Sequence, residues 1–252
     1  MEHDFNDNPE RLQSWGIQLG VLNKENNFGK DPDELLDWVS QELASIQPEQ
    51  EMPEDYHALA ADVRRMRPND PYFRQAHIQE WLARAIALLC RAHDLRYLQG
   101  LQELAVPFLL ADDPDRGLDS TTPPAALQAC LAAFVCRFLP EVFRAEDEGI
   151  TALRCQVELV AQLTLYHDPL LASNLRRLGF SPDTYATPWV VTAFASQLPL
   201  DALLALWDLL IAAGDPLLLH FFPAAFLIQQ RELVLGAPAA ELPAAAVDLL
   251  KE

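Results

Sequence analysis

The chain is organised around two stretches that each carry a polar signature, LAADVRRMRP at residues 59–68 and YLQGLQELAVPFLL at residues 97–110. Between them, apolar residues recur at Leu82, Ile86 and Leu89, which is the spacing of a helix with one buried face. The sequence therefore predicts that a packed helix, at about residues 81–95, holds an arginine-bearing segment and a glutamine-bearing segment at a fixed separation.

The composition favours helices throughout the chain. Half of the 252 residues are hydrophobic, and there are only 9 glycines, while the 19 prolines fit helix starts and loops. No segment alternates between apolar and polar residues for long enough to predict a strand, so we predict an all-α fold. Besides the central helix, we expect helices at about 9–22, from Asp31 to 43, and at 125–138, 150–166, 169–178, 189–197, 199–213 and 217–233, with a short one near 244 and a loop at 111–124.

Three features of these segments are specific enough to test. Asp31, followed by Pro32 and Glu34, forms a capping signal for a helix whose predicted buried face includes Leu35 and Trp38. Residues 47–55 are expected to be an acidic linker. Thr187-Pro188 is expected to start the helix at 189–197.

The charge of the chain is strongly negative, at −19 from 18 basic and 37 acidic residues. Nucleic acid and bare anionic membrane are therefore poor candidate partners. Residues 1–55 hold 14 acidic and 3 basic side chains, whereas residues 64–99 hold 7 arginines against 3 acidic side chains. The segment that carries both polar stretches is thus locally basic, which is compatible with approach to a phosphate.

Cysteine usage and hydropathy predict a cytoplasmic protein. The four scattered cysteines, Cys90, Cys130, Cys136 and Cys155, are expected to be reduced, buried thiols. The N-terminus is acidic and polar, unlike a signal peptide, and no run of about 18 apolar residues occurs. Any membrane role is expected to come through a partner.

The chain lacks the usual motifs for binding nucleotides or metals on its own. It has neither a G-x-x-x-x-G-K-[ST] loop nor a G-x-G-x-x-G turn, so we expect no bound nucleotide cofactor. It has no H-E-x-x-H and no paired C-x-x-C, so no metal site is predicted. Cys90 and His93 stand three apart on a helix, for which core packing is the expected role, and structural roles are also expected for His167 and His220.

Several motifs in order resemble those of TBC-domain Rab GTPase-activating proteins. Leu59-x-x-Asp62-x-x-Arg65 is similar to their I-x-x-D-x-x-R motif, and Tyr97-x-Gln99-Gly100 to their Y-x-Q motif. The resemblance covers about residues 9–235 and is greatest to the TBC domain-containing kinase-like branch. Further blocks that match in order are Arg11 and Trp15, Pro107-Phe108-Leu109, Tyr166-His167-Asp168-Pro169, Pro182-Asp183-x-Tyr185-Ala186-x-Pro188-Trp189, Phe194-Ala195, Pro199-Leu200 and Leu206-Trp207-Asp208.

The resemblance implies the architecture and the partner. It implies a V-shaped, two-subdomain helical domain at 9–252, with an N-terminal subdomain at about 9–145, a C-terminal subdomain at about 146–252, and a flexible tail at 1–8. The partner is expected to be a Rab-family small GTPase in its GTP form, which itself binds the GTP and the Mg²⁺. The expected location is cytoplasmic, peripheral to intracellular membranes.

The resemblance also assigns roles to particular residues. Arg65 corresponds to an arginine finger and Gln99 to a glutamine finger, both supplied in trans to the GTPase, so that the chain is an activator rather than an enzyme. Asp62 would direct Arg65, Tyr97 would pack beneath the loop that carries Gln99, and Gly100 would let the backbone turn closely there.

Two departures from the family pattern keep another reading open. Met66 stands where a threonine often follows the arginine, and Gln102-Glu103 replaces a more usual Asn-containing pair. The alternative is a catalytically weak or inactive domain that acts as a small-GTPase effector, a tether or a scaffold.

Overall fold

The computed structural model describes residues 11–22, 31–111, 124–144 and 146–236. No strand occurs in these ranges, and the prediction of an all-α fold is confirmed. The elements are α1 Arg11–Gln18, α2 Pro32–Ser45, α3 Pro48–Glu51, α4 Tyr56–Arg65, the 3₁₀ helix η1 Tyr72–Arg74, α5 Ala76–His93, η2 Leu101–Ala105, α6 Val106–Leu110, α7 Pro124–Phe138, α8 Glu146–His167, α9 Pro169–Arg177, α10 Pro182–Val191, α11 Leu200–Ala213, α12 Leu218–Gln229 and α13 Arg231–Gly236.

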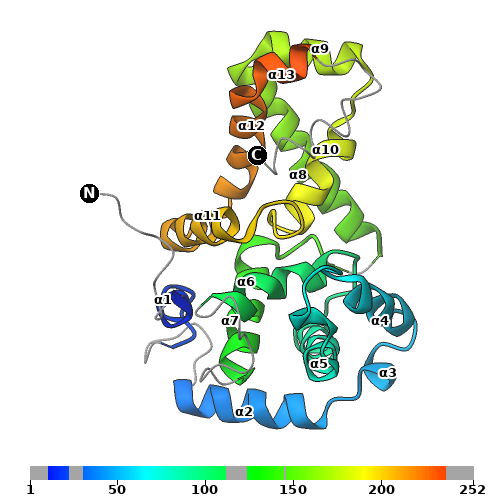
Figure 1. Ribbon diagram of the computed structural model, residues 1–252, viewed down its shortest axis with the longest axis vertical. Helices are drawn as coiled ribbons and strands as arrows, with labels where there is room; N and C mark the ends of the chain where they lie inside the picture. The colour runs from blue at the N-terminus through cyan, green and yellow to red at the C-terminus, as the bar shows by residue number, and fades with distance from the viewer. Residues whose placement is uncertain (1–10, 23–30, 112–123, 145, 237–252) are drawn as a thin grey trace.

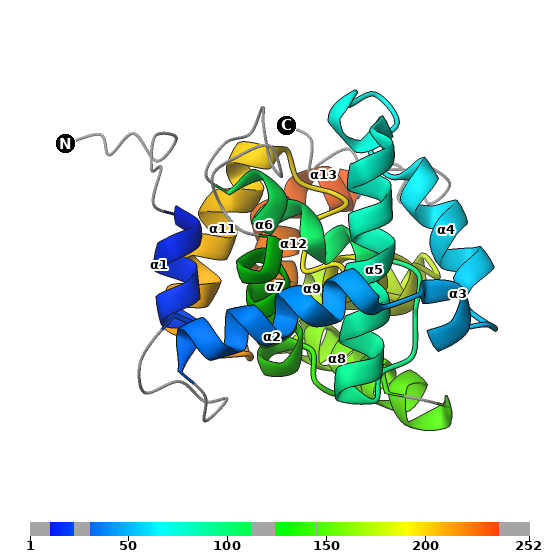
Figure 2. The ribbon, with the colours of Figure 1, turned by 90° about the horizontal axis from the view of Figure 1, so that it is seen from below.

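The helices gather into two halves along the long axis of the molecule (Figure 1). Elements α1 to α7 form the N-terminal half, in which α2 crosses α5 and α7 (Figure 2) and packs against both. In the C-terminal half, the long helix α8 packs against α9, α10 and α12. Helix α11 lies where the halves meet, in contact with α1 and α6.

An aromatic cluster closes the junction between the halves. Trp207 of α11 stacks on Phe134 of α7, with ring centroids 4.0 Å apart, and meets the edge of Phe108 of α6 at 5.4 Å. Trp15 of α1 lies 6.1 Å from Trp207. All four rings are at most 1% exposed, so they form one continuous core between elements distant in sequence.

The predicted helix signals are confirmed at several ends. The Asp31 side chain accepts a hydrogen bond from the backbone N–H of Asp33 and thereby caps α2. Helix α11 follows Pro199 and ends at Gly214, whose φ of 63° is the left-handed conformation that glycine adopts without strain. Trp38, however, is 37% exposed, whereas Leu35, Val39 and Leu43 on the same helix are buried.

Other predictions about the elements are wrong. Residues 48–51 form the short helix α3 inside the expected linker, and the expected helix at 217–233 is divided into α12 and α13 at Gln230. The helix expected at 189–197 instead begins at Pro182, because the Ser181 hydroxyl accepts a hydrogen bond from Asp183 N–H and caps α10 there. Pro188 lies inside that helix.

Some expected features lie outside the described residues, namely the tail at 1–8, most of the loop at 111–124 and the helix near 244. The division into subdomains at about residue 145 stays a prediction. Within the described ranges, none of the helices combines the length and the apolar character needed to cross a membrane.

Candidate functional site

Arg65 is presented at the exposed end of α4. The helix stops there because Met66 adopts an extended backbone and Pro68 follows two residues later. The Arg65 side chain is 72% exposed, and its Nη2 donates a hydrogen bond of 2.6 Å to Oδ1 of Asp62, one turn earlier on the helix. Since a guanidinium has five N–H donors, this bond leaves donors free to face a partner.

The carboxylate of Asp62 connects α4 to the glutamine-bearing loop. Asp62 is only 6% exposed, and its Oδ2 accepts a hydrogen bond of 2.8 Å from the hydroxyl of the buried Tyr97. Burial and the neighbouring carboxylate raise the pKa of Tyr97 well above its ordinary value, so the phenol keeps its proton. One buried carboxylate thus restrains both Arg65 and the start of the loop that carries Gln99.

Gly100 fixes the backbone after Gln99. Its backbone φ of 111° is rarely adopted by residues that carry a side chain, and a Cβ added there would lie 2.9 Å from Cγ1 of Val191. The Gln99 side chain is exposed and, within the part of the chain that is described, makes no hydrogen bond. Its amide is therefore presented to solvent from a rigid turn.

Gln102 supports this loop in a way that the sequence did not reveal. Its Oε1 accepts a hydrogen bond of 3.0 Å from the N–H of Gly100 and lies 2.9 Å from the hydroxyl of Tyr97. Gln102 is 5% exposed. Although Gln102 stands where the family usually has an asparagine, its side-chain amide still takes part in the hydrogen bonds of the loop.

Two further charged residues lie beside this network, and neither was predicted. Arg67 donates a hydrogen bond of 2.9 Å from Nη2 to the carbonyl of Ala195, in the C-terminal half. Glu103 is mostly buried, which raises the pKa of its carboxyl to about 7; Arg67 opposes that rise and Asp62 adds to it. The sequence shows an acidic residue three positions after Gly100, but it does not show that this residue is mostly buried.

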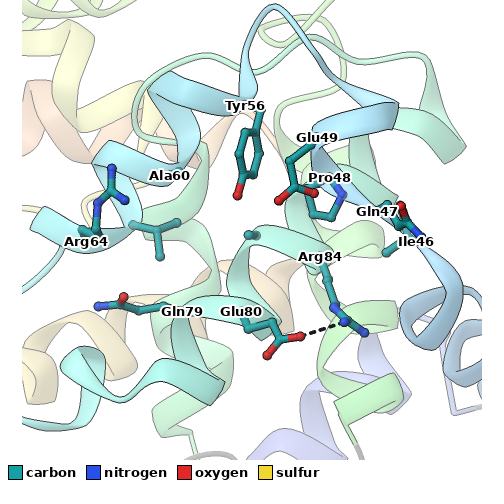
Figure 3. A pocket seen from close by; sticks show the side chains of 12 residues that line it. Ile46, Gln47, Pro48, Glu49, Tyr56, Ala60, Arg64, Gln79, Glu80 and Arg84 are labelled. Carbon is teal, nitrogen blue, oxygen red and sulfur yellow. Dashed lines mark hydrogen bonds and ion pairs between the residues drawn. The ribbon is translucent and has the colours of Figure 1, made fainter.

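A hollow of about 350 Å³ lies beside α4 but contains neither Arg65 nor Gln99 (Figure 3). Two pairs of its polar groups interact with each other. Arg84 pairs with Glu80 at 2.7 Å, and a hydrogen bond to Glu49 raises the pKa of Tyr56 above its ordinary value. With the acidic side chains of Glu49 and Glu80 in its lining, this hollow is less suited to phosphate than the exposed Arg65.

Two of the four cysteines, and His220, are buried as structural roles would require. Cys90 is buried, which raises the pKa of its thiol to about 12, and Cys130 is buried too, but Cys136 and Cys155 are exposed, contrary to the prediction. His220 is buried, and burial lowers its pKa. In the described ranges, no group of three or more His, Cys, Asp or Glu side chains could hold a metal ion.

Comparison with known proteins identifies relatives of the chain. A human TBC domain-containing protein kinase-like protein is 32% identical over 122 residues, which is 48% of this chain and 12% of the human protein. The Dictyostelium discoideum protein of the same name is 30% identical over 203 residues, covering 74% of this chain and 18% of that protein. The chain thus spans less than a fifth of the length of these relatives.

Solved structures show the same fold. The Ypt/Rab-GAP domain of Gyp1p superimposes with a TM-score of 0.76 at 18% identity, over 96% of this chain and 86% of that one. The Chlamydomonas flagellar RabGAP TBC domain gives a TM-score of 0.71 at 17% identity, over 97% and 76% of the two chains. The model of the Rab-GTPase-TBC domain family matches residues 8–235, and the chain belongs to that family.

Proposed function

We propose that the chain is a GTPase-activating domain that stimulates GTP hydrolysis by a Rab-family small GTPase in its GTP form. Arg65 and Gln99 enter the partner's active site, and the partner supplies the GTP and the Mg²⁺. The chain contributes side chains in trans and turns over no substrate of its own. It works in the cytoplasm at membranes where the partner resides.

The observation that carries this proposal is the shared carboxylate. Asp62 is hydrogen bonded to Arg65 at 2.6 Å and to Tyr97 at 2.8 Å, and Gln99 follows Tyr97 by two residues. The buried carboxylate of Asp62 therefore restrains both the exposed guanidinium and the loop that carries the exposed amide. The family and the fold support the same role, since the matched model describes a Rab-GTPase-TBC domain and the Gyp1p domain is a Ypt/Rab-GAP domain.

The chemistry of GTP hydrolysis explains why these two residue types are required. Negative charge spreads over the phosphate oxygens in the transition state, and a planar guanidinium supplied in trans stabilises it, by roughly 10³–10⁵ in rate. The attacking water must also be held in line with the bond that breaks. An amide suits that task because it donates and accepts hydrogen bonds at once.

The test is GTP hydrolysis by a panel of purified Rab proteins, measured with the wild-type chain, Arg65→Ala and Gln99→Ala. At least one Rab should be accelerated by the wild type, and each substitution should remove nearly all of that acceleration. Arg64→Ala, one residue away and also exposed, is the matched control and should retain most of the activity.

The same experiment separates the alternative function. If no Rab is accelerated while a GTP-loaded Rab still binds with measurable affinity, the chain is a recognition module. Arg65 and Gln99 would then have no catalytic role. Circular dichroism of each variant establishes that a lost rate is not a lost fold.

A further inference from the structure

The residues that follow Arg65 and the backbone that follows Gln99 both contact the same short segment of the C-terminal half. This segment, residues 191–195, begins at the last residue of α10 and is called the platform below. The carbonyl of Ala195 accepts the hydrogen bond of Arg67, which lies two residues after Arg65. On the other side, the Gly100 backbone lies so close to Val191 and Thr192 that a Cβ would meet their side chains at 2.9 and 3.1 Å.

The platform is itself rigid. Its five residues are at most 5% exposed, and Ala193 and Phe194 hold left-handed φ angles of 44° and 66°. The N–H of Ala195 bonds to the carbonyl of Thr192 at 2.8 Å, and the carbonyl of Ala193 accepts a hydrogen bond of 3.0 Å from the buried Trp207. Two consecutive non-glycine residues in this conformation persist only where the surrounding structure enforces it.

Arg67 occupies its position at a cost. Its own φ is 42°, its guanidinium is largely withdrawn from solvent, and its Nε–H is buried with no hydrogen-bond partner among the described residues. An unpaired buried donor and a strained backbone each destabilise a fold. Strain of this kind gathers at positions where geometry serves function.

We propose that the platform sets the separation of Arg65 from Gln99, and that Arg67 is the positioning residue that fastens the arginine side to it. The inference rests on the proposed function. Arg67 touches neither nucleotide nor water in this role; it acts through Arg65. Because a displacement of about 1 Å in a reacting group can cost 10²-fold in rate, loosening one loop should lower the rate at saturation and leave partner affinity nearly unchanged.

The decisive variant is Arg67→Met, which keeps an unbranched side chain and removes the donor. Single-turnover GTP hydrolysis is measured with a responsive Rab as the domain concentration is raised to saturation. We expect a rate at saturation that is about 10-fold lower or more, with half-saturation within about 2-fold of wild type. Arg67→Lys should recover part of the rate, because an ammonium can donate to the same carbonyl.

Arg137→Met is the matched control. Arg137 also donates to a backbone carbonyl of a distant element, from Nη2 to Gly214 at 2.9 Å, but far along the chain from either finger. It should leave the rate at saturation unchanged. An unaltered rate for Arg67→Met, or a loss confined to affinity, would overturn the inference.

Hydrogen exchange of the domain alone distinguishes this inference from the proposed function. In Arg67→Met, the amides of Gly100 and of the platform should exchange faster, whereas Arg137→Met should leave them as in the wild type. If exchange changes as expected but the wild type accelerates no Rab, the two loops are coupled and the proposed catalysis is wrong. If exchange at both loops is unchanged, the coupling is refuted whatever the GTPase assay gives.

Discussion

At the scale of single residues, the candidate site depends on buried groups that hold exposed ones. Asp62, Tyr97 and Gln102 are buried, and they are hydrogen bonded to one another or to the backbone of Gly100. Arg65 and Gln99, the residues that would reach a partner, are exposed. In a medium of low dielectric such a network is stiff, because each unpaired member would carry the full cost of its burial. The network therefore restrains the Arg65 side chain and the backbone next to Gln99, and it leaves donors of Arg65 and the amide of Gln99 free for a partner.

Glu103 gives this site a measurable dependence on pH. Burial raises the pKa of its carboxyl from the ordinary 4.5 to about 7, so the folded chain binds a proton there that the unfolded chain releases. Between these two values the free energy of unfolding must fall as the pH rises, and above about pH 7 the full penalty is present. We expect Glu103→Gln, which cannot ionise, to be more stable than wild type above pH 7, by on the order of 2–3 kcal/mol, and equal to it near pH 4.

Urea unfolding at a series of pH values checks this prediction. Taking the difference between the two chains at each pH cancels the titration of all other groups. A stability difference that does not change between pH 4.5 and 7 would show that Glu103 is ionised normally. Arg67 and Asp62 are the charged groups that face Glu103, so the Arg67→Met variant should move the wild-type slope to higher pH.

At the scale of elements, one carboxylate of the C-terminal half contacts two residues of the N-terminal helix. Oδ1 of Asp208, on α11, accepts a hydrogen bond of 2.8 Å from the indole N–H of Trp15 and lies 3.3 Å from Nε of Arg11. Trp15 and Arg11 are 1% and 4% exposed. Removal of the carboxylate would take the acceptor from the buried indole N–H of Trp15 and one charged partner from the buried Arg11.

We therefore expect Asp208→Ala to lower the free energy of unfolding by roughly 2–4 kcal/mol. Asp208→Asn should cost less, because its amide oxygen can still accept from Trp15. Urea unfolding measures the total cost, and hydrogen exchange of residues 12–18 measures the release of α1. Unchanged protection of α1 in Asp208→Ala would show that packing of its apolar face alone holds the helix.

The sequence predicts these elements well where the signal is local. Asp31 with Pro32, and Pro199 with Gly214, mark helix ends by capping chemistry that needs no distant partner. It fails where two local signals compete. Thr187-Pro188 is the predicted helix start, whereas the cap at Ser181 begins α10 at Pro182. The helix then continues through Pro188, which has no N–H to offer the Thr184 carbonyl, in a stretch where Tyr185 and Trp189 are buried.

The candidate site shows the same limit. Asp62, Tyr97 and Gly100 stand in recognisable motifs, and the structure brings them together. The contact between Arg67 and Ala195 joins residues 128 apart in the chain, and no periodicity predicts such a pair. The spacing of Trp38 on α2 predicts burial, but the side chain is 37% exposed.

At the scale of the whole molecule, part of the uneven charge noted in the sequence is paired in three dimensions. Arg84 pairs with Glu80, Arg91 with Glu42 and Glu51, and Arg96 with Asp55 at 3.7 Å. Three of these four carboxylates come from the acidic segment 1–55. Part of the positive charge of the locally basic segment is therefore paired in space, and Arg65, like its neighbour Arg64, is exposed.

The two halves should also unfold as one unit, because the aromatic cluster at the junction belongs to both. Trp207 is fully buried against Phe134 and Phe108 of the N-terminal half, and its indole N–H holds the platform through Ala193.

Truncation of a buried tryptophan typically costs about 3–5 kcal/mol. We expect Trp207→Ala to lower the free energy of opening by a similar amount in α5 and in α8, although neither helix is part of the cluster. Hydrogen exchange across a urea series measures both helices in the same sample, and Leu209→Ala, an exposed position on the same helix, is the matched control and should change neither. If α5 kept its wild-type protection while α8 lost its own, the halves would be independent folding units.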